Sequence, residues 1–301
     1  MDFDRNLDPS LLDEIGPWSE RKFGIVQEYA TVYSTIMANA KARLSRFDHD
    51  YIDAYASAGF SRRKGTNDLV KGTALRSLEI EPPFKHYTFV ELRADRYAML
   101  KAHVMSRDDV SVLNSDANAV LPSRVFPQYT FSNYRRAFCL LDPYTHKQLD
   151  WSTIEAAGRN GAIDLLLHFP TMPMNRGALH RDGDVSPEEA AAMTRFWGDE
   201  SWREAVYVRD GLFANVATKA TDLAFATAFC ERLKTVAGFK DTSKPIPMLN
   251  TRGATMYYLI FALPHPTAVR AAKSVAQYFI QHPSAAGKTR GSEVGMQASL
   301  N

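Results

Sequence analysis

Four acidic side chains follow four successive β-like segments of this chain. Asp53 lies near the end of 49–55, Glu91 near the end of 86–92, Asp116 just after 109–114, and Asp142 near the end of 136–144. Ligands of open α/β sheets bind beyond the carboxyl ends of the strands, so we expect these carboxylates to converge on one crevice. Each acid taken alone is also typical of a solvated loop or a helix cap.

The first of these segments runs into a turn of very small side chains, YIDAYASAGF at 51–60. Small residues let backbone N–H groups approach a ligand without clashes from Cβ atoms. We therefore expect Asp53, Ala54, Tyr55, Ala56 and Gly59 to bind a cofactor. A tight turn with nothing bound is the alternative.

The set of acids suits a nucleoside with a positively charged tail. Asp53 would accept from an ammonium group or a water, and Glu91 from both hydroxyls of a ribose. Asp116 would accept from an exocyclic adenine N–H, with Asn118 assisting. Leu92 and Ala117 adjoin these acids and complete the expected cofactor-binding set. This pattern predicts S-adenosylmethionine as the cofactor. A nicotinamide-dependent oxidoreductase is disfavoured, because the G-x-G-x-x-G that cradles a pyrophosphate is absent.

The triplet Asp142-Pro143-Tyr144 bears on the reaction. It resembles the Asp/Asn-Pro-Pro-Tyr/Phe element of methyltransferases that modify exocyclic amines of nucleobases, with one proline in place of two. In that reading Asp142 orients the amine, Tyr144 stacks on the base, and Arg176 meets a phosphate. A strand-end Asp-Pro turn without chemistry is the alternative.

Elements that position these residues follow from periodicity and turn signals. Apolar residues recur at helical spacing over 18–44, and strand-like runs alternate with helical segments from there to 170. The segments 245–250 and 254–263 flank a Thr-Arg-Gly turn typical of a hairpin. We predict an α/β fold: a doubly wound, mostly parallel, seven-stranded sheet of the class I methyltransferase type, Rossmann-like, with the last strand antiparallel. The expected parts are a loose lead-in (1–17), the main domain (18–282) with a helical cap insertion (171–240), and a disordered tail (283–301).

Composition limits the other classes of function. Thirty-six Lys and Arg against 34 Asp and Glu leave a net charge of +2, so no global charge indicates a nucleic-acid or membrane protein. The two cysteines and the scattered histidines lack metal-ligand spacing, and we expect no metal. The longest apolar run has ten residues, too short for a membrane span. With no signal peptide at the start, these features predict a cytoplasmic protein.

An ordered series of motifs resembles the three-Cys-motif partner proteins of bacteria and phages. It runs over about 16–282 and includes Trp18 and Lys22, YIDAYASAG, KGTALRSL, HYTFVELRADRYAML, SDANAVL, LLDPYTHKQLDWSTIEAAGRNGAIDLLLHFPTMPMNR and PMLNTRGATMYYLIFALPHP. The resemblance implies a class I methyltransferase-like fold. It also implies a partner protein with three cysteines, of a radical-chemistry type.

This chain departs from the family pattern at two places beside the expected pocket. Ser57 stands where the family has glycine, and Thr73-Ala74 replace Ser-Pro. Two functions therefore stay open. One is a methyltransferase acting on an exocyclic amine of a nucleobase or nucleotide, with nucleic acid or a nucleotide as substrate. The other is a non-catalytic module that works with the three-cysteine protein, which Ser57 and the single proline favour.

Overall fold

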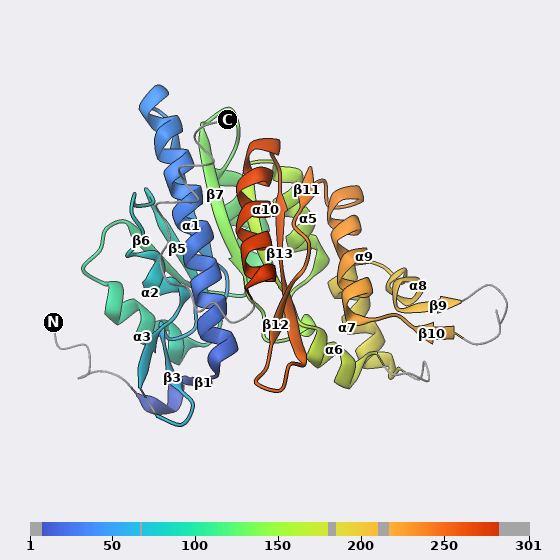
Figure 1. The fold of residues 1–301 in the computed structure, drawn as a ribbon. Coiled ribbons are helices and arrows are strands. Elements are labelled where there is room, and N and C mark those ends of the chain that lie inside the picture. Colours follow the sequence, from blue (N-terminus) through green and yellow to red (C-terminus); the bar gives the residue numbers. More distant parts are fainter. Residues whose placement is uncertain (1–7, 67, 180–184, 210–216, 283–301) are drawn as a thin grey trace.

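An eight-stranded mixed sheet forms the centre of the computed structural model, which describes residues 8–66, 68–179, 185–209 and 217–282 (Figure 1). The strand order is β11-β13-β8-β7-β2-β5-β6, and β12 also pairs with β13. The strands are β2 (Asp48–Asp53), β5 (Tyr87–Glu91), β6 (Val110–Asn114), β7 (Arg135–Leu141), β8 (Ile163–Phe169), β11 (Asp241–Thr242), β12 (Ile246–Leu249) and β13 (Thr255–Leu263).

Strands β6, β5, β2, β7 and β8 are parallel, and β13 is antiparallel to β8. Both β11 and β12 pair with β13 in the antiparallel sense and form one interrupted edge strand. The predicted α/β class and the antiparallel late strand are confirmed. The sheet is mixed and has eight strands in place of the predicted seven, because its edge is divided into β11 and β12. The general type is Rossmann-like.

Alternating side chains of the sheet build two cores, as the period of two along a strand requires. Tyr51, Phe138 and Leu140 face one core, and Ile52, Cys139 and Leu141 face the other. Both cysteines are buried and free, as expected for small apolar side chains. The near-continuous apolar run of β7 is typical of a parallel strand that is covered on both sides.

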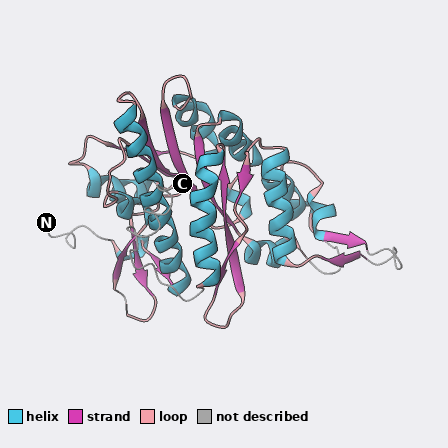
Figure 2. Ribbon diagram, turned by 45° about the horizontal axis from the view of Figure 1, so that its top comes forward, coloured by secondary structure: helices cyan, strands magenta, loops and turns pink. Residues whose placement is uncertain are grey.

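Helices cover both faces (Figure 2). On the Tyr51 side lie α1 (Pro17–Arg43), α2 (Thr73–Ser77), α3 (Ala94–Val104) and α10 (Pro266–Gln281). On the Ile52 side lie α4 (Ala117–Val120), α5 (Trp151–Asn160), α6 (Thr171–Gly177), α7 (Pro187–Trp197), α8 (Trp202–Val206) and α9 (Asp222–Thr235).

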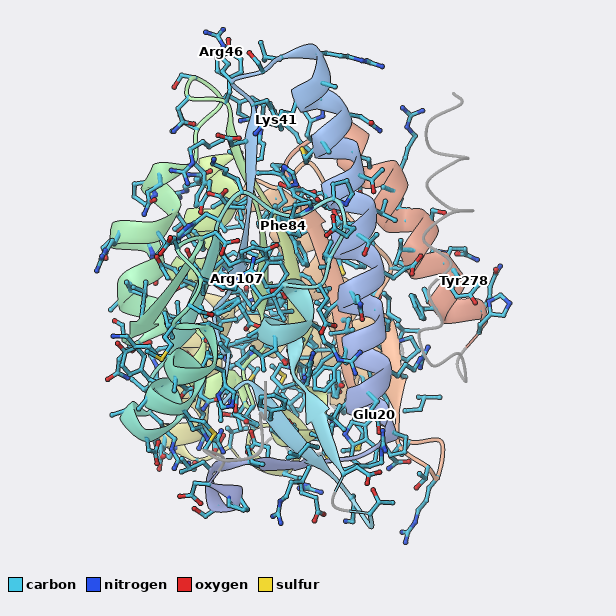
Figure 3. The ribbon with its side chains drawn as sticks, turned by 90° about the vertical axis from the view of Figure 1, so that its left-hand side faces the viewer. Glu20, Lys41, Arg46, Phe84, Arg107 and Tyr278 are labelled. Atoms are coloured by element: carbon cyan, nitrogen blue, oxygen red, sulfur yellow. The ribbon has the colours of Figure 1, made fainter. Side chains whose placement is uncertain are left out.

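Helix α1 runs alongside the whole sheet. It begins after Gly16 with Pro17 in its first turn, where the missing N–H of proline costs nothing. Its 27 residues span about 40 Å at the usual helical rise. Figure 3 shows it passing from Glu20 at one end to Lys41 at the other. This helix therefore contributes side chains to both ends of the sheet.

Several local predictions were wrong. The lead-in was expected to be loose, but it forms a 3-10 turn (Pro9–Leu11) and β1 (Asp13–Ile15). Residues 61–70, whose polar, glycine-bearing sequence SRRKGTNDLV is typical of a loop, contribute to a hairpin of β3 (Phe60–Arg63) and β4 (Leu69–Lys71), and β1 pairs with β3 in parallel. The hairpin β9 (Tyr207–Arg209) and β10 (Ala217–Lys219) was not predicted. The predicted tail, 283–301, lies outside the described residues.

Candidate functional site

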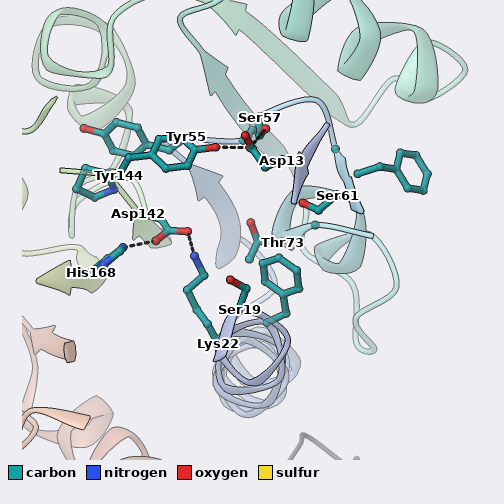
Figure 4. A pocket seen from close by; sticks show the side chains of 16 residues that line it. Asp13, Ser19, Lys22, Tyr55, Ser57, Ser61, Thr73, Asp142, Tyr144 and His168 are labelled. Carbon is teal, nitrogen blue, oxygen red and sulfur yellow. Dashed lines mark hydrogen bonds and ion pairs between the residues drawn. The ribbon is translucent and has the colours of Figure 1, made fainter. Parts of the chain in front are cut away.

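A cavity of about 90 Å³ lies at the carboxyl ends of β2, β7 and β8; we call it the strand-end cavity (Figure 4). It is closed on one side by the start of α1 and on another by the small β1-β3-β4 sheet. Its lining consists of Asp13, Ser19, Lys22, Phe23, Tyr55, Ala56, Ser57, Gly59, Phe60, Ser61, Gly72, Thr73, Asp142, Pro143, Tyr144 and His168.

The small-residue turn forms one wall of this cavity, and its backbone explains its composition. Gly59 has a φ of +85°, and a Cβ there would lie 3.0 Å from Leu100 Cδ1. Ser57 has a φ of 54°, which is in the left-handed region that favours glycine. Of the five residues predicted to bind a cofactor here, Tyr55, Ala56 and Gly59 line the cavity, whereas Asp53 and Ala54 lie buried beneath it. The small side chains of this turn therefore form a wall of the cavity.

Asp53 is fully buried behind this wall. Thr73 donates its hydroxyl to Asp53 Oδ2 at 2.5 Å, and the Tyr55 N–H donates to Oδ1 at 3.2 Å. Burial raises the pKa of Asp53 to about 7, and nearby Asp142 adds to the increase. Thr73 lines the cavity. Asp53 would therefore affect a ligand in the cavity in two ways, through the Thr73 hydroxyl that it binds and through its own charge.

Asp142 lies between two partners that the sequence analysis did not place beside it. Lys22 Nζ lies 2.5 Å from Oδ2, and His168 Nδ1 lies 2.7 Å from Oδ1. All three side chains are between 11% and 14% exposed, which makes this a largely buried ionic cluster. Burial opposes ionisation of Asp142, but Lys22 and His168 together hold its pKa well below the usual range. Asp142 is therefore an anion whose two oxygens are already engaged.

The state of His168 follows from that of Asp142. Since the carboxylate is ionised, the proton shared at 2.7 Å belongs to Nδ1 of His168. Burial lowers the pKa of His168, with Lys22 opposing the increase that Asp142 would cause. The imidazole is thus neutral near pH 7, and its Nε2 carries a lone pair. Such a nitrogen is suited to accept a proton from a nucleophile.

A second cluster closes the mouth of the cavity. Arg96 Nη2 lies 2.6 Å from Asp13 Oδ1, and the Tyr144 hydroxyl donates to the other oxygen of Asp13. Ser57 Oγ donates to the same oxygen at 3.2 Å and accepts from Arg96 at 3.3 Å. Figure 4 shows Asp13 and Ser57 side by side at this point. The lead-in segment was expected to be loose, but Asp13 holds its strand β1 across the mouth of the cavity. The hydroxyl of Ser57 contributes one of these hydrogen bonds.

The remaining predicted cofactor residues lie outside the cavity, at the ends of β5 and β6. Glu91 is buried and accepts from the Arg93 N–H at 2.8 Å, whereas Leu92 is 66% exposed. Asp116 is exposed and caps α4 by accepting from the Asn118 N–H. Ala117 is buried in the core.

Asn118 has a structural role in this arrangement. Its side chain donates to the Gln148 carbonyl at 2.9 Å and accepts from the Asp150 N–H and the Thr153 hydroxyl, each at 3.0 Å. The Tyr55 hydroxyl donates to the same Gln148 carbonyl at 2.8 Å. These bonds tie the turn after β6 to the wall of the cavity.

Arg176 and the predicted cap are not part of this arrangement. Arg176 is exposed on α6 and does not line the cavity. None of the described residues of 171–240 lines it either. Helices α7 and α9 instead pack Phe196, Phe225 and Phe229 against Phe169 at the end of β8. This region covers a face of the sheet.

Sequence reasoning missed Lys22 and His168 as members of the site. A usable signal existed for His168, which is a polar residue inside the apolar run LLLHF. Leu141 of β7 pairs with Leu167 of β8, so the next residues, Asp142 and His168, are neighbours in register. Lys22 comes from a helix, and no strand register predicts its position. The sequence analysis named Lys22 only as part of the motif series that resembles the three-Cys-motif partner proteins.

Two findings limit the functions that the described part of the chain can have. Within it, no three His, Cys, Asp or Glu side chains gather closely enough to hold a metal ion. None of its helices has both the length and the apolar character that crossing a bilayer requires.

No family model and no curated protein matches this chain. Among solved structures it is similar to Trm1 from Pyrococcus horikoshii in complex with S-adenosyl-L-methionine, at 14% identity over 80% of this chain and 54% of that one, with a TM-score of 0.42. It is also similar to the methyltransferase domain of a bacterial CtHen1, at 12% identity over 79% of this chain and 100% of that one, with a TM-score of 0.37. At such low values these likenesses carry no inference about activity, and the fold type rests on the strand order described above.

Proposed function

We propose that this protein is an S-adenosylmethionine-dependent methyltransferase of the class I type. The observation that carries the proposal is the strand-end cavity itself. A left-handed small-residue turn, a buried Asp53 and an ionised Asp142 converge there from the carboxyl ends of neighbouring parallel strands. Asp142 is paired with Lys22, whereas Asp53 accepts, among the described residues, only from Thr73 and the Tyr55 N–H. An ammonium group of a ligand beside Thr73 would supply the positive charge that Asp53 lacks, and such a place at the carboxyl ends of the strands suits a ligand.

The size of the cavity decides which part of the cofactor it suits. Its 90 Å³ is smaller than the roughly 150 Å³ that holds a benzene ring. The cavity therefore fits a short aliphatic arm with its amino group, near Thr73 and Asp142. The nucleoside would lie outside, toward Tyr55, Glu91 and Asp116, whose positions at the adjoining strand ends favour it. In this assignment Glu91 and Asp116 keep the acceptor roles that the sequence predicted.

When bound, S-adenosylmethionine supplies an electrophilic methyl group. The residues of this chain supply orientation and a proton acceptor. Asp142 fixes the Nδ1–H tautomer of His168, and Lys22 keeps Asp142 ionised. His168 Nε2 would take the proton that a nucleophile loses on methylation. This revises the role predicted for Asp142, because both of its oxygens are engaged before any substrate amine arrives.

The proposed acceptor is an exocyclic amine of a nucleobase or nucleotide. Tyr144 is 54% exposed at the mouth of the cavity and offers a ring face on which a base would stack. Pro143 holds Tyr144 directly after Asp142. Removal of a proton from an amine is the task for which a neutral, buried histidine is suited.

Transfer of a labelled methyl group from S-adenosylmethionine to adenine- or cytosine-containing nucleotides and oligonucleotides tests this proposal. We expect His168→Ala to lower the rate by about 10²–10⁴ fold and to leave cofactor affinity nearly unchanged. The exposed His282, which follows the last residue of α10, provides the matched control His282→Ala, which should keep full activity. A fully active His168→Ala enzyme would contradict the assigned role.

One observation favours the second function, a non-catalytic module that works with a three-cysteine protein. The mouth of the cavity is fastened by the Asp13, Arg96 and Tyr144 cluster, which engages the tyrosine proposed to stack. In this case the protein would bind the cofactor or its demethylated product without transfer to any acceptor. Co-purification with a three-cysteine partner, together with unchanged cellular activity of Asp142→Ala, would establish this function in place of the first.

A further inference from the structure

A second cavity, which we call the distal cavity, lies at the opposite end of α1. Its volume is about 240 Å³, and its walls are mostly apolar side chains of α1, of α10 and of the loops before β2 and β7. Met37, which lines it, is 15 residues along α1 from Lys22, a separation of about 22 Å at the helical rise. Figure 3 shows the Lys41 end of α1, far from the Glu20 end that borders the strand-end cavity. The two cavities are separate sites.

The distal cavity contains a buried carboxylate that the proposed methyl transfer does not use. Asp164 of β8 lines the cavity and is only 5% exposed. The Tyr29 hydroxyl donates to its Oδ2 at 2.8 Å. Among the described residues, Oδ1 has no hydrogen bond and the carboxylate has no ion pair. Burial raises the pKa of Asp164 to about 7, although the Tyr29 hydrogen bond and the charge of Arg136 oppose this rise.

A second polar group on the same wall also lacks a partner. Tyr33 is 2% exposed and lines the cavity, and its hydroxyl has no hydrogen-bond partner within the described chain. Buried polar groups without partners are rare and costly, at about 1–3 kcal/mol each. The Tyr33 hydroxyl of α1 is such a group, and Oδ1 of Asp164 on β8 accepts no hydrogen bond from the described residues. One ligand with a hydrogen-bond donor could contact both from the cavity.

Charge decides which class of ligand fits. The guanidinium of Arg136 also lines the cavity, but it lies 3.8 Å from the Phe131 ring centroid and donates to the Thr130 and Arg135 carbonyls, both at 3.0 Å. These contacts occupy part of its donor capacity, and Asp164 repels an anion. Arg136 interacts with Asp164 through its charge, but its hydrogen bonds go to the two carbonyls, so a ligand ammonium would supply the donor that Oδ1 lacks among the described residues.

We propose that the distal cavity binds a small primary amine with an aromatic or branched aliphatic body. The ammonium group would pair with Asp164 and donate to the Tyr33 hydroxyl, while the body would fill the apolar space beside Met37 and Ile36. The volume exceeds the roughly 150 Å³ that holds a benzene ring, so a body of that size fits. This proposal does not depend on methyltransferase activity.

Isothermal titration with three matched probes tests it: phenethylamine, phenethyl alcohol and 3-phenylpropionate. We expect phenethylamine to bind with a Kd on the order of 1 mM or below, at least tenfold tighter than the other two. Asp164→Asn, which keeps the acceptor for Tyr29, should weaken amine binding at least tenfold. Ala40→Phe, which fills the cavity from α1 without changing charge, should abolish it.

Asp142→Asn in the strand-end cavity is the matched control and should leave amine binding unchanged. Circular dichroism of each variant confirms that it is folded. Equal binding of the three probes, no binding of any of them, or amine binding that survives Ala40→Phe in a folded protein would overturn the proposal. Loss of amine binding in Asp142→Asn but not in Asp164→Asn would assign the amine to the other cavity and would overturn it too.

Discussion

Removing the ammonium group of Lys22 perturbs the proposed site at a largely buried ionic contact. In Lys22→Met, Asp142 loses the partner that lies 2.5 Å away, in surroundings where the two side chains are only 12% and 14% exposed. Breaking a buried pair from one side costs about 3–5 kcal/mol, because the remaining charge is left without compensation. Since His168 still donates to Asp142, we expect the free energy of unfolding to fall by about 3 kcal/mol, which is the lower end of this range.

The loss should depend on pH with a defined sign. Lys22 helps to lower the pKa of His168, whereas Asp142 raises it. In Lys22→Met the pKa of His168 therefore rises, and its protonated form replaces part of the lost positive charge. A folded-state pKa that rises adds stability at low pH, which is lost as pH increases through that value. The destabilisation should thus be smaller at about pH 5.5 than at about pH 8.

Urea unfolding of a double-mutant cycle measures this quantity. Asp142→Asn alone should also destabilise, and Lys22→Met with Asp142→Asn should recover most of the loss, with a coupling of at least about 2 kcal/mol. The exposed pair Arg203–Glu200, at 44% and 62% exposure, is the matched control and should couple by about 0.5 kcal/mol or less. A Lys22→Met cost below about 1 kcal/mol at pH 8, with an unchanged urea m-value, would refute the buried-cluster reasoning.

Three further predictions concern backbone strain and buried acids. Ser57→Gly should be more stable than Ser57→Ala by about 1 kcal/mol in urea unfolding, because the φ of 54° favours glycine; equal stabilities would contradict the left-handed assignment. Gly59→Ala should cost at least about 1 kcal/mol, because its φ is +85° and the new Cβ would meet Leu100; a neutral substitution would contradict this packing. The pKa of Asp164 rises from 3.8 to about 7 on folding, so its share of stability is present below about pH 4 and is lost as pH rises to about 7. Relative to the wild type, Asp164→Asn should therefore gain up to about 4 kcal/mol between about pH 4 and pH 8, and a constant difference across that range would argue against the raised pKa.

The sheet was predictable because its signals are local. The sequence alone shows three of these signals: the apolar run of β7, the similar run of β8 and the Thr-Arg-Gly turn before β13. The parallel strands β2, β5, β7 and β8 are buried on both sides, so hydrophobicity and length define them without knowledge of their neighbours. The order of the strands at the carboxyl edge places Asp142 on the wall of the cavity and Asp53 buried beneath it. Glu91 and Asp116, which we expected in the same crevice, do not line the cavity.

The parts that sequence reasoning missed depend on distant partners. Strand β1 has three residues and exists because it pairs with β3, 48 positions later at Asp13↔Ser61. Lys22 reaches Asp142 across 120 residues, and no periodicity encodes that contact. His168 was accessible in principle through the β7–β8 register, but it was considered only as a possible metal ligand. Ser57 was recognised as a departure from glycine, yet its hydrogen bond to Asp13 depends on the unpredicted strand.

Calorimetric titration of the purified chain with S-adenosylmethionine and with S-adenosylhomocysteine tests the central proposal most directly. We predict that each binds in the micromolar range, at one site per chain, and that an Ala56→Phe substitution on the cavity wall weakens both at least tenfold. If neither compound gives a detectable heat of binding at concentrations up to about 1 mM, the assignment of the strand-end cavity as a cofactor site is contradicted.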